Sequence, residues 1–227
     1  MNETLKFFYH HYPNRTSDGI VVLWPTQAIE TYWCDYPPIW EGRVGDPNAK
    51  SNCIVNDHPT VAALHVLLEK VLRLPTSVVS AAERAKWTSF AKILPDIPLL
   101  DGPGNVKVVS PYASYPVNSA RHNGETPELY SVHPYRYFSM GGKILRNRDI
   151  TPAQLCMTDP SMGAPTCGNS RGNSGWNQGV MNAALLGLTD IASNNVISRA
   201  KTAPAVGYRF QGFAPHEQDY EVSVITL

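Results

Sequence analysis

Two polar residues, Gln27 and Glu30, lie three positions apart in a segment rich in aromatic rings. Residues three apart share one face of a helix, and we expect a short helix over residues 26–34. A carboxyl held among aromatic rings has its neutral form favoured, as a general acid requires. The alternative is a surface glutamate near a helix start, where the helix dipole favours negative charge. The rings in question belong to Trp24, Tyr32 and Trp33.

A second polar run covers residues 125–136 and holds two acids, a histidine, an arginine and two tyrosines. Side chains of these types at this density are typical of the wall of a ligand site. A solvated rim explains the same composition equally well, so the residues alone leave both interpretations open. A ligand wall would use Glu125, Glu128, Tyr130 and His133.

Residues 216–221, His-Glu-Gln-Asp-Tyr-Glu, place three carboxylates after a histidine, which raises the question of a metal site. The His-Glu-x-x-His motif is absent, and no two histidines have zinc-ligand spacing in a clear helix. Walker, Gly-x-Ser-x-Gly and dinucleotide-binding motifs are absent as well. We therefore expect no metal and no other cofactor. Carboxylates, amides and aromatic rings remain, and enzymes that act on sugars use these groups.

The overall composition indicates a folded chain with no general affinity for polyanions. Nineteen basic and nineteen acidic residues give zero net charge, so the sequence predicts no nucleic-acid partner. Apolar residues make up 43%, enough for a packed core. No apolar run is long enough to span a membrane, and we expect no membrane association.

Hydrophobic periodicity predicts a mostly α-helical protein. A helix is expected from about 61 to 72, and a capping box at Ser80–Glu83 starts a second helix that forms a hairpin with it. A second hairpin is expected over 176–203, and a further apolar segment starts near 128 until Pro134 interrupts it. Two excursions, 95–127 and 147–174, are rich in turn residues, and the first contains a possible strand at 106–109.

Four cysteines form two local pairs, and we expect disulfides Cys34–Cys53 and Cys156–Cys167 that clamp loop-like stretches. Two glycosylation sequons begin at Asn2 and Asn14 and agree with an oxidising compartment. We therefore expect an extracellular protein, although this chain carries no export signal.

Five segments together resemble a group of six-hairpin glycosidase-like proteins. More distantly, the chain is similar to glycoside hydrolase family 95, the inverting α-L-fucosidases and related exo-glycosidases. The distant likeness rests on Leu129-Tyr130 followed by Pro134, and on Gly175-Trp176 at a helix start. The five segments are Trp24-Pro-Thr-Gln-Ala-Ile-Glu-Thr-Tyr-Trp-Cys-Asp-Tyr-Pro37, Asn56-Asp-His-Pro-Thr-Val61, residues 125–136, Gly175-Trp-Asn-Gln-Gly-Val-Met-Asn-Ala-Ala184 and Pro215-His-Glu-Gln-Asp-Tyr-Glu221.

The resemblance implies an (α/α)6 barrel of twelve helices, whereas the sequence predicts about six. We therefore expect residues 1–227 to form one partial catalytic domain, truncated at both ends. Glu30 falls where the family has its general acid. Val222-Ser223-Val224 replaces the segment that carries the family's base, which leaves Asp219 as the candidate base.

The implied activity is inverting hydrolysis of a glycan or oligosaccharide, incomplete in this chain. The alternative is an inactive carbohydrate-binding remnant, in which aromatic rings still hold sugar. The residues expected to contact sugar are Trp24, Gln27, Trp33, His58, Glu125, Glu128, Tyr130, His133, Trp176, Asn177, Gln178 and Glu217.

Overall fold

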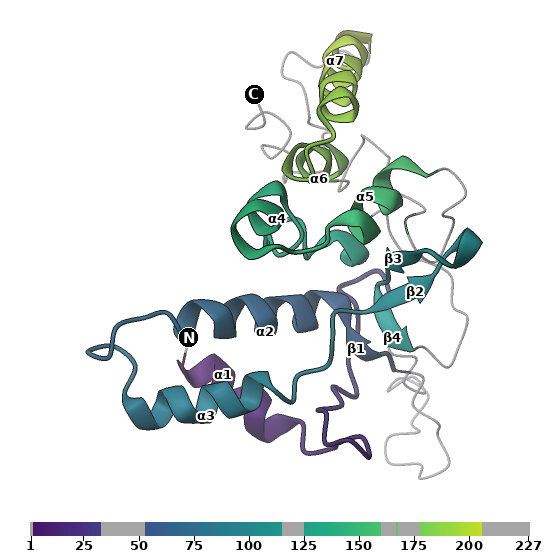
Figure 1. Cartoon of the computed structure of the whole chain (residues 1–227). Helices are drawn as coiled ribbons and strands as arrows, with labels where there is room; N and C mark the ends of the chain where they lie inside the picture. The colour runs from purple at the N-terminus through teal and green to yellow at the C-terminus, as the bar shows by residue number, and fades with distance from the viewer. Residues whose placement is uncertain (1, 33–52, 115–124, 160–166, 168–177, 206–227) are drawn as a thin grey trace.

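The computed structural model describes residues 2–32, 53–114, 125–159, 167 and 178–205, with side chains up to residue 198. Within them lie seven α-helices and two pairs of short strands, so the expectation of a mostly α-helical protein is confirmed. The described elements do not show a six-hairpin barrel, which stays a prediction. Figure 1 shows α1, α2 and α3 in the lower part of the view, α4 to α7 above α2, and the strands at the right beside the start of α2.

Helices α2 (His58–Val71) and α3 (Ala81–Ala91) form the expected hairpin. Asp57 caps α2, because its Oδ1 accepts a hydrogen bond of 2.9 Å from the Thr60 amide. At the start of α3, Ser80 and Glu83 form the reciprocal capping box. The buried stripe of α2 faces the core, and it consists of Val61, Leu64, Leu68 and Val71.

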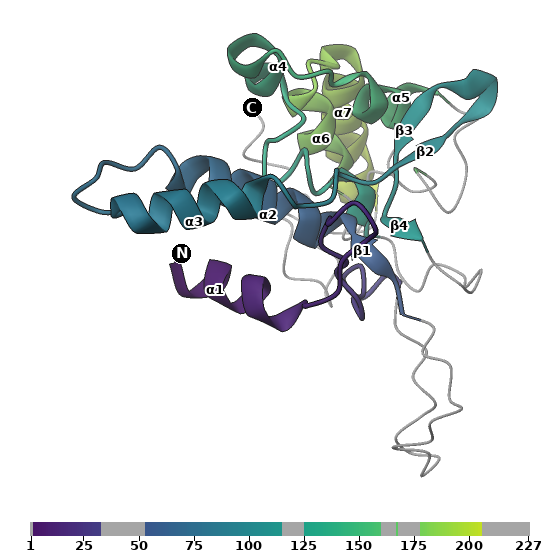
Figure 2. The same cartoon turned by 60° about the horizontal axis from the view of Figure 1, so that its bottom comes forward.

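Helix α1 (Asn2–His11) covers the hairpin and was not expected from the sequence. The ring of Tyr9 on α1 packs edge to face against the ring of Phe90 on α3, and the two centroids are 5.4 Å apart. At its start, Asn2 Oδ1 accepts a hydrogen bond of 3.1 Å from the Trp87 indole. In Figure 2, α1 runs alongside α3 and α2. Helix α1 is therefore held by tertiary contacts to aromatic residues.

Two antiparallel strand pairs lie at the end of α2 where this helix begins (Figure 1). Strand β1 (Val55–Asp57) pairs with β4 (Tyr112–Ser114), and β2 (Leu99–Asp101) pairs with β3 (Lys107–Val109). The expected strand at 106–109 is confirmed by β3. The turn between β2 and β3 contains the short 3-10 helix η2 (Pro103–Asn105), where Gly104 has φ +73, a conformation that glycine adopts without strain.

Helices α6 (Gly179–Leu185) and α7 (Thr189–Ala205) form the second expected hairpin. Gly187 lies between them with φ +74, and its amide donates to Ala184 O. The Leu188 amide donates to Ala183 O, so the orphan carbonyls at the end of α6 are satisfied. The predicted hairpin is confirmed over the described residues.

Three expectations about local structure are corrected. Residues 26–32 are not helical, because Thr26 pairs with Ile54 and Ala28 pairs with Tyr32 across a turn. The segment near 128 contains only the 3-10 helix η3 (Pro127–Leu129) followed by turns. Two helices were missed, α4 (Met140–Arg146) and α5 (Thr151–Thr158), and α5 lies inside the stretch expected to be a loop.

The predicted disulfide Cys156–Cys167 is confirmed, and it ties α5 to a residue eleven positions further along the chain. Both half-cystines are fully buried. Cys53 is also disulfide-bonded, while Cys34 lies outside the described residues. Disulfide Cys156–Cys167 therefore fixes the loop after α5 to the core.

Replacing Cys156 and Cys167 together by alanine is expected to lower the free energy of unfolding by about 3 kcal/mol, because the unfolded chain regains the entropy of an open loop. Urea denaturation followed by circular dichroism measures this loss. Repeating the denaturation of the variant with reductant measures separately how much the disulfide of Cys53 contributes to stability. A double variant as stable as the parent would show that the clamp is dispensable.

Candidate functional site

Residues 24–32, here called the Trp24 turn, present three of the predicted site residues to solvent: two sugar contacts and the candidate acid. Trp24 is 40% exposed, and Gln27 and Glu30 are exposed as well. Between them, Thr26 and Ala28 are buried. The turn is therefore two-sided, with an indole, an amide and a carboxyl on the side that faces water.

Backbone hydrogen bonds fix the Trp24 turn to the segment that leads into α2. The Thr26 amide donates to Ile54 O at 3.2 Å, and the Asn56 amide donates to Leu23 O at 2.9 Å. In return, the Asn56 side chain accepts a hydrogen bond of 2.8 Å from the Leu23 amide. These pairings place the turn next to the cap of α2.

Asp57, the cap of α2, is a buried carboxyl with an exposure of 1%. Burial raises its pKa to about 6, although hydrogen bonds from Thr60 and Thr26 oppose the shift. A carboxyl with this pKa exchanges its proton near neutral pH. The Thr26 contact ties it to the Trp24 turn.

The charge of Asp57 acts on two tyrosines. Burial, and next the negative charge of Asp57, raise the pKa of Tyr12 and of Tyr135. The Tyr135 ring meets the Tyr130 ring with centroids 6.3 Å apart. Burial also raises the pKa of Tyr130, with the charge of Glu125 as the next cause. The phenol groups of all three tyrosines therefore stay protonated at neutral pH and can donate hydrogen bonds.

A hydrogen bond, a ring contact and the charge of Asp57 link three segments that the sequence put forward separately: the Trp24 turn, the start of α2 and the run 125–136. We call the connected set the Asp57 cluster, and it consists of Thr26, Asp57, Glu125, Tyr130 and Tyr135. The cluster combines a carboxyl that titrates near neutral pH with phenols that remain donors. Such a set can hold or move a proton and can position the exposed turn above it.

Two of the expected sugar contacts, His58 and Glu128, lie inside the protein. Both have an exposure of 0%. His58 Nδ1 lies 2.8 Å from Ser110 O, and since a carbonyl only accepts, Nδ1 carries the proton. Burial lowers the pKa of His58 to about 4, so its ring is neutral at pH 7. Glu128 Oε1 accepts a hydrogen bond of 3.1 Å from the Cys167 amide.

These contacts correct the expected roles of His58 and Glu128 as sugar ligands in the described structure. His58 anchors the start of α2 to the segment before β4, and Glu128 anchors the disulfide-bonded residue Cys167. Neither side chain reaches solvent, and a residue without access to solvent does not contact an incoming sugar. Their positions instead stabilise the elements on which the Asp57 cluster is built.

Of the remaining predicted site residues, the structure describes only some. His133 and Gln178 are half-buried, and burial lowers the pKa of His133 with Arg136 as the second cause. Five others lie outside the described residues: Trp33, Trp176, Asn177, Glu217 and Asp219.

The sequence did not single out Asp57, Tyr12 or Tyr135 as site residues. The run Asn56-Asp57-His58-Pro59-Thr60 carried the signal of a helix start, and Asp57 is indeed the cap. Its burial and the effect of its charge on two tyrosines depend on segments far apart in the chain. No local pattern could have revealed them.

Within the described residues, no group of three or more His, Cys, Asp or Glu side chains could hold a metal ion. None of the described helices is long and apolar enough to cross a bilayer. No family model, curated protein or solved structure matches the chain.

Proposed function

We propose that the chain is a glycoside hydrolase-like domain that binds carbohydrate on the Trp24 turn, with Glu30 as the proton donor. The observation that carries this proposal is the two-sided turn, in which Trp24, Gln27 and Glu30 are exposed while Thr26 and Ala28 are buried. An indole, an amide and a carboxyl on one exposed segment match the groups that recognise and cleave sugars.

Each exposed group has a distinct task in this proposal. The Trp24 indole stacks on the apolar face of a sugar ring, and the Gln27 amide hydrogen-bonds to its hydroxyls. Glu30 protonates the oxygen of the leaving group. A second carboxylate, about 6.5–9.5 Å from the acid, activates water for attack with inversion. We assign this role to Asp219, which lies outside the described residues.

Asp57 is a positioning residue in this scheme. It is buried, so it does not contact sugar, but it holds the start of α2 through Thr60 and contacts Thr26 of the turn. The backbone pairing of Thr26 with Ile54 fixes the same place. Together these contacts give the exposed residues a fixed base, which binding and catalysis both require.

The second candidate function is carbohydrate binding without turnover. The exposure of Glu30 favours this alternative, because a general acid usually lies in an apolar pocket that keeps it protonated. The described structure does not enclose Glu30 in this way. An exposed platform with Trp24 and Gln27 still binds sugar.

A panel of oligosaccharides separates the two candidates. Calorimetry measures binding, and release of reducing sugar measures hydrolysis. Binding with release supports the hydrolase, and binding without release supports the second candidate. A chain that neither binds nor cleaves any sugar of a broad panel contradicts both.

Replacing Trp24 by alanine is expected to weaken oligosaccharide binding at least about tenfold, because burial of a large ring contributes about 1.5–3 kcal/mol. Calorimetric titration of the best sugar of the panel measures the change. Phe7→Ala is the matched control, since Phe7 is an exposed aromatic residue on α1. Equal losses in both variants, or no loss in Trp24→Ala, would contradict the assignment of the platform.

A further inference from the structure

A pocket of about 500 Å³ lies between α2 and residues 134–148, and its charged lining is almost entirely basic. Among the described residues that line it, Glu69 is the only carboxylate. The chain as a whole has zero net charge, whereas the described lining of the pocket has a surplus of four positive charges. Such a surplus creates a local positive potential that attracts anions. The five cations are Lys70, Arg73, Arg136, Arg146 and Arg148.

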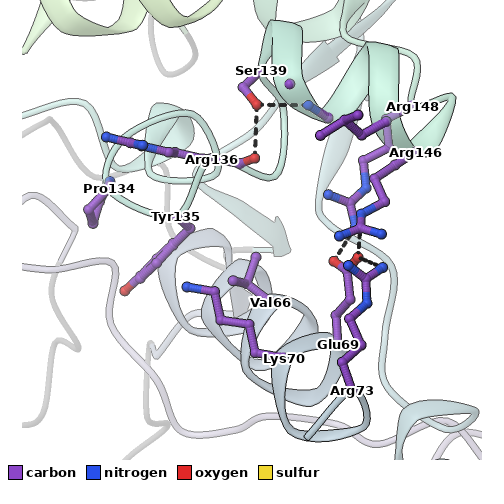
Figure 3. Close-up of a pocket in the computed structure, with 13 residues that line it drawn as sticks. Val66, Glu69, Lys70, Arg73, Pro134, Tyr135, Arg136, Ser139, Arg146 and Arg148 are labelled. Atoms are coloured by element: carbon purple, nitrogen blue, oxygen red, sulfur yellow. Dashed lines mark hydrogen bonds and ion pairs between the residues drawn. The ribbon is translucent and has the colours of Figure 1, made fainter.

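On one side of the pocket, three guanidinium groups share the carboxylate of Glu69 (Figure 3). Arg73 Nη2 and Arg146 Nε lie 2.7 and 2.8 Å from its Oε1. Arg148 Nη2 lies 2.6 Å from its Oε2. One carboxylate accepts about four hydrogen bonds, whereas three guanidiniums carry about fifteen N–H groups. Many donors are therefore left for a further acceptor.

Arg136 and Lys70 line the other side of the pocket, where the Lys70 amino group points toward Tyr135 and the Arg136 side chain extends away from the Glu69 group (Figure 3). Within the described residues, neither Lys70 nor Arg136 forms an ion pair with a carboxylate. Arg136 also has a left-handed backbone, with φ +57, which is costly for a residue other than glycine. Its amide donates to Val132 O at 2.8 Å, and its carbonyl accepts from Ser139 Oγ at 3.0 Å. Arg136 is thus held in place at the pocket.

A purely structural role accounts for only part of this arrangement. The bonds from Arg146 and Arg148 to Glu69 fasten the α4 region to α2, and this role requires no ligand. Lys70 and Arg136 add two further like charges to the same cavity, and like charges repel one another. The structural role therefore leaves these two residues unexplained, whereas an anion in the pocket gives their charges a counterpart.

We propose that this pocket binds the phosphate or sulfate group of a small ester. Guanidinium forks match the geometry of tetrahedral oxyanions, and the lysine adds a point charge. The volume is in the range of small-molecule sites and leaves room for a sugar-sized remainder beside the anion. Tyr135 and Val66 supply an aromatic ring and an apolar surface for that remainder. This proposal does not depend on the function proposed for the Trp24 turn.

Titration calorimetry of the full chain tests the proposal with glucose 6-phosphate, glucose 6-sulfate, inorganic phosphate and uncharged glucose at constant ionic strength. We expect saturable binding of one equivalent of at least one ester and none of glucose. The two esters distinguish a phosphorylated from a sulfated ligand. Inorganic phosphate reports how much the remainder contributes.

Lys70→Gln and Arg136→Gln are each expected to weaken the ester's binding about tenfold or more, as loss of a hydrogen bond to a charged group does. Lys143→Gln is the matched control, because Lys143 is an exposed cation of α4 that does not line the pocket. Far-UV circular dichroism without ligand checks that each variant folds. No binding of any ester, or equal weakening in the control, would overturn the proposal.

Discussion

Replacing Glu30 by glutamine is expected to lower hydrolysis of ordinary glycosides by about 10²–10⁴-fold, because the amide cannot protonate the leaving oxygen. Glycosides with a very good leaving group should lose less, since they depart without a proton. Oligosaccharide binding should stay close to the parental value, because glutamine keeps the shape of the side chain. Initial rates of sugar release on both kinds of glycoside, with calorimetry for binding, measure these effects.

The matched control for this variant is Glu3→Gln. Glu3 is another exposed glutamate, paired with Lys6 on α1. This control should leave the rates unchanged. Should Glu30→Gln hydrolyse ordinary glycosides at the parental rate, Glu30 would be a surface residue of the turn, which is the alternative that its sequence position leaves open. A parent that binds sugar without releasing any would favour the second candidate function.

Asp57 and His58 are expected to have opposite effects on stability between about pH 4 and pH 6.5. Burial raises the pKa of Asp57 from 3.8 to about 6, so the folded protein binds this proton first and gains stability as pH falls through that window. Burial lowers the pKa of His58 from 6.5 to about 4, so the unfolded chain binds that proton first and stability is lost. The two contributions largely cancel in the parent.

Single substitutions separate these two contributions. Asp57→Asn keeps a helix-capping side chain, and compared with the parent it should lose up to about 3 kcal/mol of stability as pH falls, since one pKa unit equals about 1.4 kcal/mol. His58→Gln should show the reverse slope, a gain of up to about 3 kcal/mol over the same window. Urea denaturation from pH 4 to pH 7, expressed as the difference from the parent, measures both slopes.

The slopes, rather than the absolute stabilities, decide the outcome. His58→Gln also disturbs the contact with Ser110 O and lowers stability at every pH, but such a constant loss leaves the slope unchanged. The double variant should be as flat as the parent. Equal slopes in the parent and both single variants would show that neither group titrates as its burial requires.

Local features of the sequence were enough to predict the elements whose signals lie within a few residues of one another. The capping box at Ser80 and the apolar stripe of α2 are such features, and the structure confirms them. The disulfide Cys156–Cys167 joins residues only eleven positions apart and was predictable for the same reason. A cap, a helical period and a short loop depend mainly on nearby backbone geometry.

Tertiary contacts decided the remaining features, because they bring together residues with no local relation. Thr26 is extended rather than helical because its amide bonds to Ile54 O, 28 residues further along the chain. Arg148 reaches Glu69 across 79 positions, so no spacing rule could reveal the basic pocket. The same holds for His58 and Glu128, which were expected to contact sugar, whereas packing buried them. The sequence thus determined the two helix hairpins and the kinds of chemical groups, and long-range packing determined the other helices and which of these groups face solvent.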